Sequence, residues 1–296
     1  QYSQNVKDAI SWMKQSDDAL VNMTDLLKTI EEKVSQAANS TNTDSDFAAI
    51  AKEVEETLNQ VRTLSNSQIG DRYIFSGQKD KTQPYSDTLT TVVSADVKTI
   101  DRTQLTDAQR TNIGAPTSKA DQFVIVKDAS DNTRYVNVDN GNILDEDFNV
   151  VDTVSGFSPT WTSTTFDTNG VPSTSTISDT GGNSYTIQTS SKEVATYNGD
   201  DNKISMTIKA GEVNAANDSV NLTGSDLFGD NIFGGKGTSL VDELTVIKDK
   251  IKAGDVAWLS DDGMTLAGKL NDQVIDAQVE TSTRQASYEM TQTMMD

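Results

Sequence analysis

Apolar side chains recur every three or four residues at both ends of this 296-residue chain, and this periodicity limits the possible fold more than any other feature. The spacing places apolar side chains on one face of a helix. It predicts a long helix over residues 6–37 and a second helix from Phe47 to Leu64, with the polar stretch 39–43 as the break between them. We expect Asp44 or Ser45 to cap the second helix.

The same spacing returns after Gly237 and continues to the end of the chain. It predicts a third helix through Leu240–Ile251 and, after a break at Asp261–Gly263, a final helix. A helix cannot bury an apolar stripe by itself, so we expect the helices of both chain ends to share one core, as in a coiled-coil bundle. From Ala277 onwards the stripe becomes small and polar, which favours contact with another subunit there.

The helical core predicted from these stripes draws on both ends of the chain. Its members are Ile10, Met13, Leu20, Leu27, Ile30, Val34, Phe47, Val54, Leu58, Val61, Leu244, Ile247, Ile251, Leu270 and Val274.

Between the helical segments the composition shifts toward Thr, Ser, Asn, Asp and Gly. Short alternating runs such as Phe123–Val126, Tyr135–Val138 and Ile204–Ile208 predict strands, and turn signals such as Asn140-Gly141 predict hairpins between them. This spacing is typical of a β-sandwich or a small barrel.

The sequence therefore predicts an α+β protein of several domains, in which an all-β domain is inserted into a helical bundle. We assign residues 1–87 to the first half of the helical domain, 88–236 to the β domain and 237–296 to the second half. The first half should include a β-hairpin, with a strand at Tyr73–Phe75 that returns at Pro84–Tyr85. Only 34% of residues are hydrophobic, which favours an elongated shape over a compact one.

Charge and composition exclude several classes of function. The formal charge is −21 and no cluster of Lys and Arg stands out, so we expect neither nucleic acid nor a membrane surface as a partner. The chain has no Cys and no His, which excludes disulfides and Ser-His-Asp or Cys-His catalysis. We expect no enzymatic activity, no cofactor and no metal.

Acidic pairs remain as candidates for acid–base chemistry or for calcium binding. They are Asp17-Asp18, Asp145–Asp147, Asp200-Asp201 and Asp261-Asp262. Pairs of this kind usually lie on solvated surface, and we expect that role for each of them.

Three local segments resemble the flagellin superfamily: Val34–Asn39, Thr43–Asp46 and Leu58–Asn66. The following Gln68–Gly77 is similar to the helix-to-hairpin junction of one branch, the type 3 hook-associated proteins of the hook–filament junction. Further similarity lies at Tyr197–Asp200. The residues of the hairpin motif are Gly70, Arg72, Tyr73, Ile74, Phe75 and Gly77.

The resemblance implies a secreted structural subunit of the bacterial flagellum, required for motility, that joins the hook-associated junction to the flagellin filament. It implies neighbouring copies of the chain, hook-associated protein type 1 and flagellin as partners, and a flagellar export chaperone before secretion. Members of this family also carry further terminal helices, so we expect such segments in the parent protein beyond Gln1 and Asp296.

Two other functions stay open from the sequence. The chain resembles flagellin itself over the segments around Ala37–Asn39, which allows a filament subunit. Alternatively, the Thr- and Ser-rich middle allows a secreted β binding module carried on a helical stalk.

Overall fold

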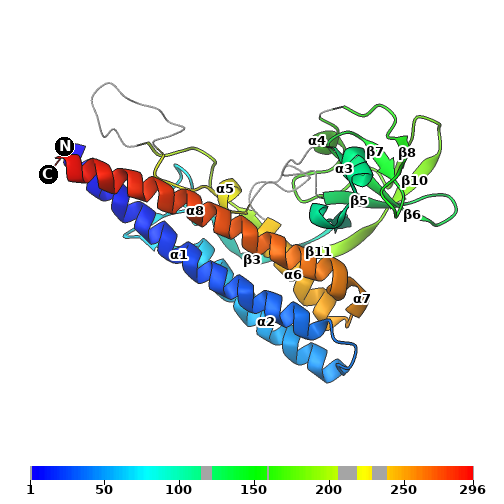
Figure 1. Ribbon diagram of the computed structural model, residues 1–296, viewed down its shortest axis with the longest axis horizontal. Coiled ribbons are helices and arrows are strands. Elements are labelled where there is room, and N and C mark those ends of the chain that lie inside the picture. The colour runs from blue at the N-terminus through cyan, green and yellow to red at the C-terminus, as the bar shows by residue number, and fades with distance from the viewer. Residues whose placement is uncertain (1, 115–121, 159, 206–218, 229–238, 296) are drawn as a thin grey trace.

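The computed structural model describes residues 2–114, 122–158, 160–205, 219–228 and 239–295. Four helices, α1 (Tyr2–Ala37), α2 (Asp44–Ser65), α6 (Ser239–Lys252) and α8 (Met264–Met295), form a long bundle. Figure 1 shows α1 and α8 side by side along its length, with both chain ends at the same tip. A β-rich unit projects from the bundle, so the predicted fold class is confirmed.

The break between α1 and α2 is built by side chains that hydrogen-bond to nearby backbone. Asn39 Oδ1 accepts the Thr41 N–H at 3.0 Å. Thr43 then caps α2 in a reciprocal box, because its backbone N–H donates to Asp46 Oδ2 at 2.8 Å while its hydroxyl accepts from the Asp46 N–H at 3.3 Å. The predicted cap at Asp44 or Ser45 is therefore wrong, since Asp44 already lies in the first turn of the helix.

The path from α6 to α8 is helical where the sequence predicted a break. A short helix α7 (Val256–Trp258) leads into a π-helical turn η2 (Leu259–Gly263), which continues into α8. A Cβ on Gly263 would lie 3.0 Å from a ring carbon of Trp258, so the missing side chain lets the turn pack against the indole. The predicted break at Asp261–Gly263 is wrong because this packing and the buried Leu259 hold the segment in helical form.

A two-stranded antiparallel ribbon carries the β-rich unit. It consists of β3 (Tyr85–Ala95) and β11 (Thr189–Tyr197), with Ala95 opposite Thr189 at one end, Tyr85 opposite Tyr197 at the other, and a shift of register between Ala195 and Tyr197. The end near Tyr85 packs on the helical core, and the other end leads into the β-rich unit. The ribbon therefore acts as the neck between the two units.

The unit beyond the neck is an antiparallel sheet in the order β8-β7-β6-β5-β10-β9, with β4 also paired to β5. A backbone bridge joins Val154, just after β8, to Asp179, just after β9. The two ends of the sheet therefore meet, and of the two predicted architectures the small barrel describes it better. Its strands are β4 (Val97–Thr99), β5 (Gln122–Lys127), β6 (Thr133–Asn137), β7 (Asn142–Leu144), β8 (Val150–Thr153), β9 (Thr176–Ser178) and β10 (Ser184–Ile187).

Short helices complete the chain, and they belong to different units. In the β-rich unit these are η1 (Arg102–Gln104), α3 (Asp107–Ile113) and α4 (Trp161–Thr165), whereas α5 (Gly224–Phe228) packs on the bundle. Val220, Leu222 and Leu227 lie buried with helical residues.

The core of the barrel runs from Ala95 to Ile187, so we propose these narrower limits for the inserted unit. Of the predicted strand 204–208, the bridge from Ser205 to Ser219 is present, and 206–208 lie outside the described residues.

One five-residue turn recurs in the barrel and begins each time with Asp. The aspartate Oδ1 accepts the N–H of the fifth residue at 2.8 or 2.9 Å, and its own backbone N–H donates to that residue's carbonyl at 3.0 Å. The fourth residue adopts a positive φ between 58° and 85°. Two of the turns have Gly at this position and two have Asp131 and Phe148, so the turn does not require glycine. The turns are Asp128–Asn132, Asp145–Asn149, Asp167–Val171 and Asp179–Asn183.

These turns predict that acid weakens the barrel. The side-chain amide of Asn132 lowers the pKa of Asp128, and that of Asn183 lowers the pKa of Asp179. Because the folded state lowers each pKa, it favours the charged form, and the resulting stability is present at neutral pH and is lost as the pH falls below about 4. We expect the melting temperature of the barrel to fall between pH 6 and pH 3.

Fluorescence of Trp161 in a variant with Trp12→Phe and Trp258→Phe reports on the barrel alone, since the chain has three Trp residues. Replacing Asp128 and Asp179 with Asn keeps an accepting oxygen and removes the titrating group, so it should flatten the pH dependence. Asp131→Asn, at an exposed position in the first turn, is the control. An equal acid slope in both variants would contradict the assignment.

Candidate functional site

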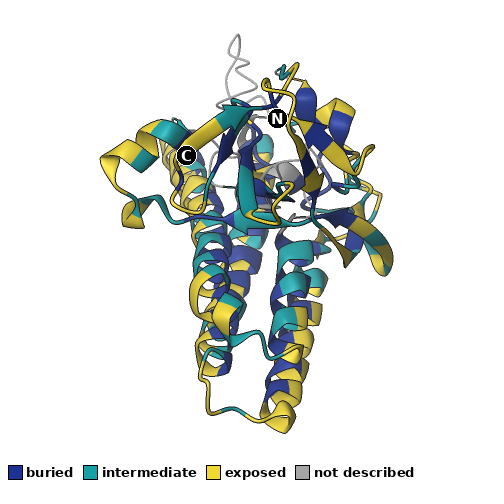
Figure 2. Cartoon of the chain, turned by 90° about the vertical axis from the view of Figure 1, so that its right-hand side faces the viewer, coloured by how far each residue is buried: buried dark blue, intermediate teal, exposed yellow. Residues whose placement is uncertain are grey.

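The predicted helical-core residues lie along the interior of the bundle, with one exception. All are buried except Ile10, which is half-buried near the chain ends beside Val6, Met13 and Tyr288. Met13 belongs to the same small cluster, and the other predicted residues join the main core of helical and neck side chains. Figure 2 shows buried positions on the faces that the helices turn toward one another.

The polar part of the final stripe is matched inside the chain. Ala277, Thr281 and Tyr288 are buried, although the sequence favoured contact with another subunit there. Asp17, the polar interruption in the stripe of α1, accepts a hydrogen bond from Ser282 at 2.9 Å. Arg284 donates to Ser219 Oγ at 2.7 Å. The bond between Ser282 and Asp17 therefore crosses the seam between α1 and α8, and the bond between Arg284 and Ser219 joins α8 to the segment before α5.

Helix α8 also carries an apolar stripe that faces solvent. Val279, Met290 and Met294 are 59%, 68% and 75% exposed. Residues 11 and 15 positions apart lie within an arc of about 60° of an α-helix, because 11 residues complete just over three turns and 15 residues just over four. This exposed stripe, defined by these three residues, is the apolar surface of α8 that is free to contact another molecule.

The hairpin motif forms a smaller hairpin than predicted. Strands β1 (Gln68–Ile69) and β2 (Arg72–Tyr73) pair across a turn at Gly70, whose φ is +62°. The predicted strand through Ile74 and Phe75 with a return at Pro84–Tyr85 is wrong, because Tyr85 begins β3 and pairs with β11. Ile74 and Phe75 are both fully buried, which the alternating faces of a strand would not allow against a single core.

The hairpin is tied to α1 through Arg72. Its guanidinium lies 5.1 Å from the centre of the Trp12 ring and forms an ion pair with Asp80. A cation over an indole face is attracted by the ring's negative charge density. Trp12 is 3% exposed, so the contact fixes the hairpin against the first helix.

Segments that are far apart in the sequence meet directly behind the hairpin. The Tyr197 hydroxyl donates to the Phe75 carbonyl at 3.0 Å and accepts from the Gly224 N–H at 3.2 Å. The Asp200 N–H donates to the Ser76 carbonyl at 3.0 Å. Gly77 has a φ of +67°, and a Cβ there would lie 2.1 Å from the Asp200 carbonyl oxygen. The motif segment and Tyr197–Asp200 thus form one packed junction.

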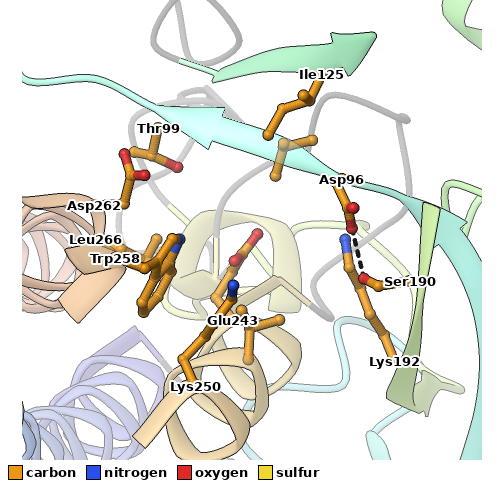
Figure 3. Close-up of a pocket in the computed structure, with 12 residues that line it drawn as sticks. Asp96, Thr99, Ile125, Ser190, Lys192, Glu243, Lys250, Trp258, Asp262 and Leu266 are labelled. Atoms are coloured by element: carbon orange, nitrogen blue, oxygen red, sulfur yellow. Dashed lines mark hydrogen bonds between the residues drawn. The ribbon is translucent and has the colours of Figure 1, made fainter. Parts of the chain in front are cut away.

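A cavity of about 190 Å³ separates the base of the barrel from the bundle. Figure 3 shows its lining, with Glu243 of α6 between Trp258 and Lys192. Burial raises the pKa of Glu243, and the charge of Lys192 opposes that shift. Beside the cavity, Lys98 Nζ of β4 lies 2.7 Å from Asp262 Oδ1 in η2.

The acidic pairs expected on solvated surface each contribute a structural contact. Asp17 accepts from Ser282, Asp145 from the Asn149 N–H, Asp200 from the Gln78 N–H, and Asp262 pairs with Lys98. Three of these partners lie more than a hundred residues away, so no local pattern could have identified them. The expectation of a purely solvated role is wrong for these four carboxylates.

The described junction and interface consist of packing and charge contacts. Among the residues that the structure describes, no group of three or more acidic side chains is placed to hold a metal ion. Within the same ranges, none of the helices combines the length and the apolar character needed to cross a bilayer.

Sequence reasoning missed Trp12 and Lys98, and it noted Tyr197 only as part of a segment similar to the family. Trp12 precedes Met13 in the apolar stripe, and including it on that face would have been justified by helical spacing alone. The partners of Tyr197 and Lys98 lie in distant segments, so the sequence did not reveal either contact.

Comparison with known proteins shows which proteins this chain resembles. Residues 1–80 match the model of the bacterial flagellin N-terminal helical region. The chain is 33% identical over 72 residues to flagellar hook-associated protein 3 of Escherichia coli, an alignment covering 24% of this chain and 23% of that protein. It is 33% identical over 147 residues to phase 2 flagellin of Salmonella typhimurium, covering 49% of this chain and 27% of the flagellin. The alignments therefore span about a quarter of each of these relatives.

A solved structure supports the fold over nearly the whole chain. A Vibrio parahaemolyticus protein assigned to the flagellar hook-associated proteins aligns with 99% of this chain and 83% of its own, at a TM-score of 0.51 and 12% identity. The predicted resemblance is confirmed: residues 1–80 match the bacterial flagellin N-terminal helical region, and the chain has homology to flagellar hook-associated protein 3.

Proposed function

We propose that this chain is part of a structural subunit of the bacterial flagellum, which joins the hook-associated junction to the flagellin filament and catalyses no reaction. The observation that carries this proposal is the similarity of the chain to hook-associated protein 3, on a fold in which residues 1–80, which match the flagellin N-terminal helical region, share a core with the C-terminal helix α8. Proposed partners are neighbouring copies, hook-associated protein type 1 and flagellin, with an export chaperone before secretion to the extracellular flagellum.

In such a subunit the bundle and the barrel have different roles. The core shared by α1, α2, α6 and α8 makes the bundle rigid, and a rigid bundle can hold contacts at fixed spacing. The exposed stripe of α8 supplies an apolar surface on that bundle, and we propose that a neighbouring subunit covers it. The barrel projects to one side, away from the tip where the chain ends lie.

Deleting the gene of the parent protein tests the proposal in cells. The expected result is cells that keep hooks, lose filaments and release flagellin into the medium, because the filament has nothing to attach to. Cells that keep long, attached filaments would contradict the proposal. Restoring the full-length parent protein should restore filaments and swimming.

The exposed stripe predicts a more specific loss. In the deletion strain, full-length parent protein with Met290→Glu and Met294→Glu should give roughly tenfold fewer filaments, because covering an unpaired carboxylate is costly. Met264→Glu is the matched control, as Met264 is also exposed on α8 but lies outside the stripe. Circular dichroism should show that both variants fold. Equal filament numbers in the two variants would exclude the stripe as a contact surface.

The alternative is a flagellin filament subunit, and the longer alignment with phase 2 flagellin favours it. The purified full-length protein distinguishes the two functions. A flagellin should polymerise into long filaments, whereas a junction subunit should not.

A further inference from the structure

An ion pair joins the barrel to the bundle at the base of the inserted unit. Lys98 in β4 contacts Asp262 at 2.7 Å and Asp261 at 3.5 Å, and both acidic residues lie in η2. The side chains of Lys98 and Asp262 are 18% and 22% exposed, so water screens their attraction only in part. Burial alone would lower the pKa of Lys98, but the hydrogen bond and charge of Asp262 outweigh it and raise that pKa. Lys98 therefore stays charged at neutral pH.

Apolar packing around this pair is incomplete. The cavity of about 190 Å³ lies directly beside it, and Val97 and Ile125 of the barrel line that cavity together with Trp258 and Leu266 of the bundle. Charged groups line the same cavity, among them Asp96, Lys192 and Glu243, so this part of the interface is not a close-packed apolar contact. The interface therefore depends more on its charges than a close-packed interface would. A second attraction joins Asp101, just after β4, to Lys269 of α8. Hydrogen bonds from Thr103 lower the pKa of Asp101 most, and the charge of Lys269 lowers it further.

Contacts between α6, α7 and η2 hold Asp262, the acidic partner of Lys98, in position. Lys250 pairs with Asp255 at 2.7 Å and lies 5.5 Å from the centre of the Trp258 ring, which ties α6 to α7. Gly263 packs closely on the same indole. A π-helical turn adds a residue to the helical path and is often found where a side chain serves a particular role. Here it holds Asp262 toward the barrel.

The remaining connection is the ribbon of β3 and β11. The part of the ribbon that contains Glu193 and Ala195 is fixed to the bundle, because the Ala195 N–H donates to Asp242 at 3.1 Å and Glu193 lies 3.8 Å from Lys248. The end of the ribbon near Ala95 and Thr189 carries the barrel. Two strands without further neighbours resist bending weakly.

We propose that Lys98 and Asp262 form a latch that fixes the angle between the barrel and the bundle, and that opening the latch lets the barrel swing on the ribbon. The latch is independent of the flagellar role, since it concerns only the relation between the two units.

The absence of cysteine makes a direct test possible, because two introduced cysteines can be spin-labelled without any other thiol in the chain. Ser130→Cys in the barrel and Lys52→Cys in α2 are both exposed. Pulsed electron paramagnetic resonance then measures the distribution of distances between the labels. We expect one narrow distribution in the otherwise unchanged chain.

In that labelled chain, Lys98→Met should add a second population at other distances, with an open fraction roughly five-fold larger than in the parent. Lys81→Met is the matched control, since it removes the exposed ion pair between Lys81 and Asp71. Lys98→Asp combined with Asp262→Lys should restore the narrow distribution. If Lys98→Met fails to fold, Asp262→Asn, which keeps the shape of the side chain, provides the same comparison. A distribution as narrow as that of the Lys81→Met control would overturn the latch.

Discussion

Replacing Leu27 with alanine is expected to lower the free energy of unfolding of the bundle by about 3 kcal/mol, within the range of 2–5 kcal/mol typical of buried leucines. Leu27 is 1% exposed and belongs to the core that contains residues of both chain ends. The substitution removes apolar surface from the core and leaves a cavity, because the long helices on either side cannot close over it without bending.

Urea denaturation followed by circular dichroism at 222 nm measures this loss. Val21→Ala on the same helix is the control, because Val21 is 40% exposed and its substitution should cost less than about 1 kcal/mol. Equal losses for the two variants would mean that α1 is not packed against the C-terminal helices in solution.

Gly77→Ala should destabilise the protein by roughly 3 kcal/mol, for two separable reasons. The positive φ of Gly77 is unfavourable for any residue with a side chain, which costs about 1–2 kcal/mol. In addition, the new Cβ would lie 2.1 Å from the carbonyl oxygen of Asp200, so the backbone of that segment must move. Moving it strains the hydrogen bond from Asp200 to Ser76.

Gly70→Ala separates the two costs. Gly70 has nearly the same φ, +62°, but a Cβ there would meet nothing within 4 Å. It should therefore cost only the conformational part, about 1–2 kcal/mol. The difference between the two variants in urea denaturation measures the contact with Asp200. A Gly77→Ala variant no less stable than Gly70→Ala would show that the segment around Asp200 does not pack on the hairpin motif.

The helical half of the fold could be predicted from the sequence because its signal is local. The stripes of α1, α2, α6 and α8 repeat every three or four residues, and a helix can bury such a stripe only against another element. The need to bury these stripes, together with the polar stretch after Ala37, predicted that the two ends of the chain pack in one bundle. The resemblance at Gln68–Gly77 added a family expectation, and that segment lies within the residues that match the flagellin N-terminal helical region.

Local errors arose where a side chain has two possible partners. Asp44 has the chemistry of a helix cap. However, Thr43 together with Asp46 satisfies two backbone N–H groups at once, so the helix is capped at Thr43 instead. Asp261-Asp-Gly263 has the composition of a loop, but Leu259 and the Trp258 ring hold it in a π-helical turn. In both places a contact decided the outcome against residue preference.

By itself, the sequence determined that two helical ends enclose a β-rich insertion, because hydrophobic periodicity is encoded within each segment. Only the tertiary structure decided that the barrel closes at Val154 and Asp179, that Tyr197 binds behind the hairpin motif, and that Lys98 meets Asp262. Each of these contacts joins residues that are distant along the chain. Their energy depends on distance and burial in space, and neither quantity can be read from neighbouring residues.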